Sequence, residues 1–226
     1  MAKRLFDILV AATGLALAAP LVVPAVLGIK LTSPGPAIYW AERMGRNGRR
    51  YRMAKLRTMH VRRESGPEIT APGDPRIFVF GRFLRLTKID ELPQLWNVLK
   101  GDMSLVGPRP ESVAIVERDY HGWMLETLTV RPGITSPGAI FGYTHGDDLL
   151  DPADPEGSYA RGQLPAKLAI ELAYIKRTNL LRDIGVILRT GWTIMQIACG
   201  RRDFPLPPEA ADAGHWHDFS ALRTGS

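Results

Sequence analysis

The sequence predicts an α+β protein that is mostly helical and carries a membrane anchor at its N-terminus. Three features support this: an uncharged apolar run from Ile8 to Ile29, two short strand-like segments after it, and several segments with helical spacing of apolar residues. We expect residues 1–31 to form the anchor, residues 32–200 one compact domain, and residues 201–226 a C-terminal tail. A chain of 226 residues suits one such domain rather than two.

The apolar run is long enough to span a bilayer, since about 20 apolar residues suffice. Lys3 and Arg4 precede it, and Lys30 follows it together with a basic cluster between Arg43 and Arg57. Cytoplasmic flanks collect Lys and Arg, so both ends of the run have the character of a cytoplasmic flank. A single straight span cannot satisfy both ends.

Two prolines, Pro20 and Pro24, lie inside the run. A proline in a helix interior removes a backbone hydrogen bond and clashes with the preceding turn, so both residues predict a bend. We therefore expect a re-entrant helical hairpin that enters and leaves the membrane on one side. A straight anchor with a translocated domain stays open, and so does a cleaved signal peptide, because the small residues around Ala18 imitate a cleavage site.

The formal net charge of +6 predicts an anionic partner. Beside a membrane segment, lipid headgroups or a phosphorylated substrate fit this charge better than nucleic acid does, and we expect no nucleic-acid partner. The single cysteine, Cys199, excludes an intrachain disulfide framework and agrees with a reducing cytoplasmic location.

The elements beyond the anchor follow from local patterns. Residues 37–40 and 51–56 are expected to form strands around a turn at 45–48. Glycine and proline predict an irregular loop over 64–75 and another over 131–165, whereas helices are expected at 78–86, 90–99, 111–128, 166–177 and 180–199. Charges within the last helix favour a packed or interfacial position over a second span. The proline-containing tail from Arg201 onward is predicted to be poorly ordered.

Candidate chemistry begins with the adjacent carboxylates of Asp90 and Glu91 at the start of the predicted 90–99 helix. Helix capping is the simplest interpretation of two acids there. Arg85 lies five residues earlier, and Arg109 is held between Pro108 and Pro110, which suits a guanidinium that binds phosphate bidentately. Because a carboxylate can attack phosphorus and Mg²⁺ can neutralise phosphate oxygens, the combination suggests phosphoryl transfer.

Five segments, in unbroken order over roughly residues 3–195, resemble the monotopic phosphoglycosyl transferases, which are bacterial sugar transferases. They are Lys3–Asp7, Lys55–Met59, Asp90–Ser104, Gly107–Pro110 and Arg131–Thr135. The resemblance implies transfer of a sugar 1-phosphate from a nucleotide diphosphate sugar, commonly a UDP-sugar, to a polyprenyl phosphate such as undecaprenyl phosphate. Such an enzyme would start a surface glycan at the bacterial inner membrane, with its catalytic domain on the cytoplasmic face. A second copy of the chain is a further candidate partner, in a homo-oligomer.

The resemblance also implies roles for single residues. Asp90 would be the nucleophile that forms a phosphosugar-enzyme intermediate, and Glu91 would help to hold Mg²⁺ or assist proton transfer, with Asp90 as a second metal ligand. Substrate binding would fall to basic residues that match the family motifs, and the role of the last of them is the least defined: Lys55, Arg85, Arg109 and Arg131.

Three departures from the family pattern are visible. Ala19-Pro20 stands at the expected membrane bend where many members have Ser-Pro, so a hydroxyl is missing and Pro24 is expected to share the bending. Lys88 occupies a position often held by a small polar residue and puts an extra positive charge near Asp90. Residues 136–139 read Ser-Pro-Gly-Ala instead of the common Gly-Trp-Ala-Gln, which points to an unusual sugar or acceptor preference.

Two other functions stay open at the level of sequence. One is phosphotransfer on a polyprenyl phosphate without a sugar donor. The other is a non-enzymatic, basic membrane scaffold in which Asp90 and Glu91 only cap a helix. His215 and His217 in the tail are interpreted as a surface pair rather than a metal site.

Overall fold

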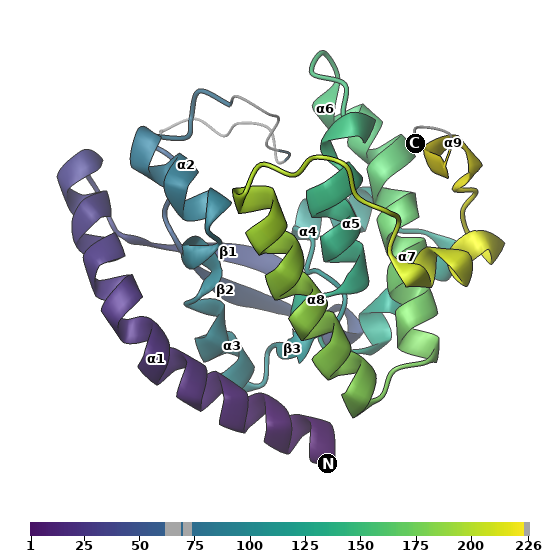
Figure 1. The fold of residues 1–226 in the computed structure, drawn as a ribbon, viewed down its shortest axis with the longest axis horizontal. Coiled ribbons are helices and arrows are strands. Elements are labelled where there is room, and N and C mark those ends of the chain that lie inside the picture. The colour runs from purple at the N-terminus through teal and green to yellow at the C-terminus, as the bar shows by residue number, and fades with distance from the viewer. Residues whose placement is uncertain (62–68, 70–73, 224–226) are drawn as a thin grey trace.

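The computed structural model describes residues 1–61, 69 and 74–223, and it confirms a mostly helical protein with a few strands (Figure 1). The α-helices are α1 (Ala2–Thr32), α2 (Val79–Leu86), α3 (Gln94–Lys100), α4 (Val113–Asp119), α5 (Pro137–His145), α6 (Pro155–Ser158), α7 (Leu164–Lys176), α8 (Leu180–Ala198) and α9 (Ser220–Arg223). The strands are β1 (Ile38–Met44), β2 (Arg50–Leu56), β3 (Ser104–Val106) and β4 (Gly133–Thr135). Most of the loop expected over 64–75 lies outside the described residues.

Helix α1 runs without interruption through Pro20 and Pro24, and Figure 1 shows it as a curved rod along one side of the molecule. Within the described chain it is the helix that is long and apolar enough to cross a membrane. Only a narrow stripe of it packs on the rest of the protein, from Asp7 to Ile29, and most of its large apolar side chains are exposed. The predicted hairpin is not formed as two helices, so re-entry stays a prediction.

The N-terminal turns of α1 are attached to the domain by polar contacts. Lys3 forms an ion pair with Asp183 of α8 at 2.5 Å, and Arg4 donates to two carbonyls at the C-terminal end of α3, at 2.6 and 2.9 Å. Asp7 accepts a hydrogen bond from the Ser104 hydroxyl at 2.8 Å. These three residues, which the sequence presented as membrane flank and motif, therefore fix the start of α1 against α3, β3 and α8.

The strand predictions are confirmed, since β1 and β2 form an antiparallel hairpin. A second, parallel pair joins β3 to β4. Gly107 follows β3 and Gly133 begins β4, and the two backbones approach so closely that a Cβ on Gly133 would lie 2.2 Å from the Gly107 nitrogen. Glycine is required there because no side chain fits between the two backbones.

The helix predictions hold for α2, α3, α7 and α8, with two exceptions elsewhere. The segment expected to be one helix over 111–128 is divided into α4 and a 3-10 segment, Gly122–Thr129. The loop expected over 131–165 is wrong, because it contains β4, α5 and α6. Ser136 caps α5 by accepting a hydrogen bond from the Ala139 amide at 2.9 Å, and Pro137 occupies its first turn. This Ser-Pro pair starts a helix rather than a turn.

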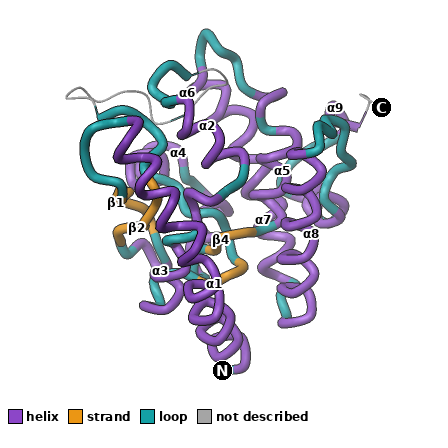
Figure 2. The backbone as a smooth tube through the Cα atoms, turned by 60° about the vertical axis from the view of Figure 1, so that its left-hand side comes forward, coloured by secondary structure: helices purple, strands orange, loops and turns teal. Residues whose placement is uncertain are grey.

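The prediction of a poorly ordered tail is also wrong for the described residues. Short helical turns after Pro207 bury Ala210, Ala213 and Phe219 in a cluster with α5 and α7. Asp212 pairs with Arg177 at 2.5 Å, which adds a polar contact to this packing. The N-terminus and the C-terminus lie at opposite ends of the molecule (Figures 1 and 2).

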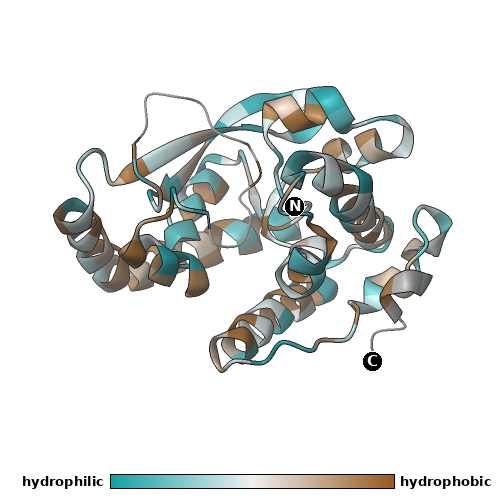
Figure 3. Cartoon of the chain, turned by 90° about the horizontal axis from the view of Figure 1, so that it is seen from above, coloured by the Kyte–Doolittle hydropathy of each residue, from teal (hydrophilic) through white to brown (hydrophobic). Residues whose placement is uncertain are grey.

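Exposed apolar side chains are not confined to α1. Figure 3 shows strong hydrophobic colour on α1, at the left-hand end, and on α8. Large apolar residues are exposed on α2, α3 and α8: Val79, Phe83, Leu86, Trp96, Leu181, Ile184, Leu188, Trp192 and Met195. A helix with such a face needs an apolar surface to cover it.

Candidate active site

The two candidate catalytic carboxylates lie in a 3-10 turn, Ile89–Glu91, between α2 and α3. The turn starts after Lys88, whose backbone is left-handed with φ of 57°. Asp90 is 1% exposed and Glu91 is 6% exposed, so both carboxylates are buried. The sequence thus located them correctly at the entry to a helix, but it did not reveal their burial.

Lys55 of β2 joins the two carboxylates. Its ammonium lies 3.2 Å from Asp90 Oδ2 and 3.2 Å from Glu91 Oε1. Asp90 Oδ1 is buried and accepts no hydrogen bond from any residue that the structure describes. Burying a carboxylate oxygen without a hydrogen-bond partner costs folding free energy, and a bound ligand that contacts this oxygen would offset that cost.

Arg109 binds the Glu91 carboxylate in a bidentate contact. One terminal nitrogen donates to Glu91 Oε1 at 2.7 Å and the other to Oε2 at 3.3 Å, while the Tyr143 hydroxyl accepts from the guanidinium at 3.2 Å. Burial raises the pKa of Glu91, but Arg109 and Lys55 outweigh burial and hold this pKa well below the ordinary value. Glu91 is therefore an anion that fixes the two cations.

The two other predicted substrate-binding residues have different surroundings. Arg85 of α2 donates to the Thr58 hydroxyl at 2.8 Å, and the charge of Asp90 acts on it, so it lies close to the carboxylates. Arg131 donates to the carbonyl of Gly101, at the opposite end of α3, at 2.9 Å. The structure therefore brings Lys55 and Arg109 onto Asp90 and Glu91, places Arg85 beside them, and separates Arg131 from them.

Glu171 of α7 is a site residue that sequence reasoning missed. It is completely buried, and its Oε1 accepts hydrogen bonds from the Ser136 hydroxyl at 2.5 Å and from the Arg109 amide at 3.2 Å. Burial raises the pKa of this carboxyl to about 7. Glu171 thus connects the backbone of Arg109 to the first turn of α5. The only sequence signal was an acid inside an apolar helix.

A cavity of about 220 Å³ adjoins this cluster and includes Lys55 and Arg109 in its wall. Its other polar lining comes from β1, α3, the segment at Glu111, α5, the turn before α7 and α7 itself: Arg43, Gln94, Glu111, Tyr143, Tyr159, Gln163 and Lys167. Gln94 Nε2 and Arg43 Nε are buried donors without a partner among the described residues. The cavity therefore offers unpaired donors to an oxygen-rich ligand.

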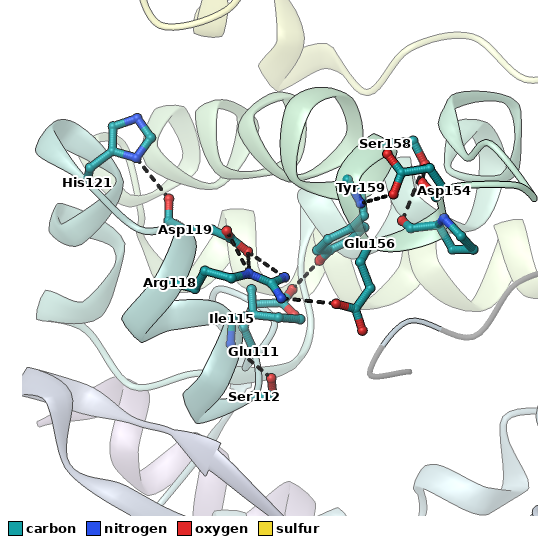
Figure 4. A network of polar contacts seen from close by, with 12 residues as sticks. Glu111, Ser112, Ile115, Arg118, Asp119, His121, Asp154, Glu156, Ser158 and Tyr159 are labelled. Atoms are coloured by element: carbon teal, nitrogen blue, oxygen red, sulfur yellow. Dashed lines mark hydrogen bonds and ion pairs between the residues drawn. The ribbon is translucent and has the colours of Figure 1, made fainter. Parts of the chain in front are cut away.

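One wall of the cavity is a closed polar network. The Tyr159 hydroxyl donates to Glu111 at 2.6 Å, and Lys167 of α7 contacts both groups. Tyr159 belongs to a π-helical turn, Tyr159–Gln163, of the kind often found at functional sites. Figure 4 shows how Arg118 of α4 reaches Glu156 of α6 next to this wall, at 3.0 Å.

The arrangement suits anionic phosphates better than a protein-only metal centre. No group of three or more His, Cys, Asp or Glu side chains that could hold a metal occurs within residues 1–61, 69 and 74–223. Four basic side chains surround two carboxylates instead: Lys55, Arg85, Lys88 and Arg109. The excess positive charge favours a ligand with several phosphate oxygens.

Comparison with known families agrees with this geometry. A family model described as bacterial sugar transferase matches residues 1–197. The chain belongs to the bacterial sugar transferase family. This membership confirms the resemblance carried by the five motifs.

Three characterised relatives illustrate the family. The chain is 40% identical over 194 residues to a UDP-glucose:undecaprenyl-phosphate glucose-1-phosphate transferase of Caulobacter vibrioides, covering 83% of this chain and 67% of the relative. It is 36% identical over 199 residues to a UDP-N-acetylgalactosamine-undecaprenyl-phosphate N-acetylgalactosaminephosphotransferase of Aeromonas hydrophila, covering 85% and 43%. It is 36% identical over 193 residues to a UDP-glucose transferase of the same kind from Escherichia coli, covering 83% and 39%. The chain thus spans about two thirds or less of these relatives.

Proposed function

We propose that this protein transfers a sugar 1-phosphate from a UDP-sugar to undecaprenyl phosphate and so starts a surface glycan. The observation that carries the proposal is the buried Asp90 carboxylate, whose Oδ1 has no partner among the described residues while Lys55 holds Oδ2. The names of the relatives support the donor and acceptor classes.

The reaction proceeds through a covalent aspartyl intermediate. Asp90 Oδ1 attacks the phosphorus that carries the sugar, and the bond from that phosphorus to the bridging oxygen breaks, so UMP leaves. An oxygen of undecaprenyl phosphate then attacks the same phosphorus, and the bond to Asp90 breaks. The carboxylate is regenerated and the product is a lipid diphosphate sugar. Lys55 and Arg109 stabilise the phosphate oxygens throughout both steps.

The residues present also fit Mg²⁺. This ion is bound in proteins by one or two carboxylates together with substrate phosphates and water, so it does not need three protein ligands. The Glu91 carboxylate and Oδ2 of Asp90 would hold it, which leaves Oδ1 of Asp90 for the attack on phosphorus. When bound, Mg²⁺ supplies charge neutralisation on the phosphate oxygens.

We further propose that α1 re-enters the membrane, so that the domain faces the cytoplasm at the bacterial inner membrane. Its first turns are attached by Lys3 and Arg4 to α8 and α3, and its last turns pack through Ala25 and Ile29 on β2 and α2. Both ends thus contact the same domain. A straight span would separate one end from its partners, whereas a curved helix that returns keeps both sets of contacts.

The test is UMP release by the full-length protein in nanodiscs with Mg²⁺, across UDP-glucose, UDP-galactose and their N-acetylated forms. We expect UMP release with one or two of these donors, and we expect its rate to increase severalfold when undecaprenyl phosphate is added. A ping-pong route also requires labelled UMP to exchange into the UDP-sugar without any acceptor. Exchange without the lipid, abolished by EDTA, would support the aspartyl intermediate.

The alternatives give different results in the same assay. A polyprenyl phosphate phosphotransferase without a sugar donor would consume the lipid phosphate and release no UMP. A membrane scaffold would show neither activity, and its membrane association would be indifferent to changes at Asp90. Release of UMP only when both substrates are present, with no exchange, would instead indicate direct transfer without a covalent intermediate.

A further inference from the structure

Lys88 is a partly buried cation to which the reaction proposed above assigns no role. It immediately precedes the 3-10 turn of Asp90 and Glu91, and its backbone is in the left-handed region, with φ of 57° and ψ of 14°. A residue with a Cβ adopts this region only when its surroundings hold it there. The strained backbone thus positions the Lys88 side chain relative to the carboxylates.

The Lys88 ammonium lies on the ring of Tyr143, 3.8 Å from the ring centroid. The hydroxyl of the same ring accepts a hydrogen bond from Arg109 at 3.2 Å. Tyr143 therefore joins the two cations, and Lys88 belongs to the same cluster as Arg109. Because a cation on an aromatic face keeps its N–H donors for other partners, this contact leaves Lys88 able to bind an anion.

Lys88 differs from its neighbours in lacking an anionic partner. Lys55 pairs with both carboxylates and Arg109 pairs with Glu91, whereas the Lys88 ammonium has no ion pair or hydrogen bond with any described residue. An incoming oxyanion would restore the charge balance that the protein alone does not provide.

We propose that Lys88 is an additional phosphate-binding residue of this site, presented by Tyr143 to an oxygen of a substrate phosphate. The proposal rests on the proposed transferase function only for the identity of that substrate. The phosphate can come from the diphosphate of the donor or from the lipid phosphate acceptor. Both have the same chemistry, a multiply charged phosphate oxyanion beside Asp90.

The experiment compares Lys88→Met, Lys88→Arg and the control Lys100→Met in the full-length protein in nanodiscs. Lys100 is an exposed residue of α3 that pairs with Asp102, so its variant removes one charge at the surface. The steady-state KM of each substrate is measured, together with the Kd of inorganic pyrophosphate. In Lys88→Met we expect the pyrophosphate Kd and one of the two KM values to rise about tenfold, because one charge-assisted contact is lost. Lys88→Arg should recover most of this loss.

The pattern of the results identifies the phosphate. A raised donor KM with slower UMP exchange in the absence of lipid assigns Lys88 to the diphosphate, and a raised acceptor KM assigns it to the lipid phosphate. If no UDP-sugar supports turnover, the transferase proposal fails, yet weaker pyrophosphate binding in Lys88→Met would still support the phosphate site. Values within twofold of Lys100→Met in all three measurements would overturn it. If Lys88→Met does not fold, Lys88→Gln takes its place.

Discussion

Two buried clusters of charge lie side by side in this protein and differ in one respect. Around Glu111, the carboxylate, the Lys167 ammonium and the Tyr159 hydroxyl all contact one another. Around Asp90, one carboxylate oxygen is unpaired and basic groups outnumber acids, counting the residues that the structure describes. Closed networks of this kind stabilise a fold, whereas incomplete ones are retained where a ligand completes them. The first cluster therefore supports the cavity, and the second is the cluster that we propose binds and reacts.

The largest effect that separates the two clusters is expected from Asp90→Asn. This change removes the proposed nucleophile and keeps the shape of the side chain, so UMP release should fall by about 10³-fold or more. The melting temperature should change by only a few degrees, because Lys55 loses its ion pair with Asp90 but keeps the one with Glu91. Release that persists within tenfold of wild type would remove Asp90 as the nucleophile.

Lys167→Met tests the closed cluster. It leaves the Glu111 carboxylate buried without its cation, which costs about 3–5 kcal/mol of unfolding free energy. For a chain of this size that corresponds to a melting temperature roughly 10 °C lower. Lys176→Met is the matched control, because Lys176 lies on the same helix, is exposed and contacts only the Trp216 ring among the described residues. Equal melting temperatures for the two variants would show that the Glu111 cluster does not stabilise the fold.

Arg109→Lys sharpens the contrast within the reactive cluster. Lysine keeps the charge but loses the fork that spans both oxygens of Glu91 and the donor to Tyr143. We expect kcat/KM for the donor to fall about 10–100-fold with a melting temperature within a few degrees of wild type. A loss of stability without a change in kcat/KM would place Arg109 with the structural residues instead.

The sequence located the reactive cluster better than the structural one. Asp90, Glu91, Lys55 and Arg109 were found because they lie in contiguous motifs whose chemistry is specific. Lys167 and Glu171 were missed, because a charge inside an apolar helix looks the same in sequence whether it faces solvent or the core. Burial depends on which helices pack together, and no local pattern encodes that.

Errors in the fold have a similar origin. Ser136 and Pro137 were interpreted as loop residues, although the same pair is a good helix start and here begins α5. The prolines of the tail suggested disorder, yet Ala210 and Phe219 find a buried surface. Local signals thus predicted strand and helix boundaries where the pattern was unambiguous, and tertiary packing decided the rest.

Glu171→Gln tests a third kind of buried carboxyl, one without a cation in contact among the described residues. Its pKa is raised to about 7 when folded, against about 4.5 when unfolded, so the unfolded chain loses this proton first. Stability from this group is therefore full below about pH 4.5, falls as the pH rises toward 7, and then levels off, a change on the order of 3 kcal/mol. Glutamine keeps the acceptor for Ser136 and Arg109 but does not titrate. Melting temperatures are measured at pH 5, 6, 7 and 8. The melting temperature of the variant, relative to that of wild type, should rise up to pH 7 and not beyond. Parallel curves would mean that Glu171 is already charged in the folded protein, although the described residues place no cation in contact with it.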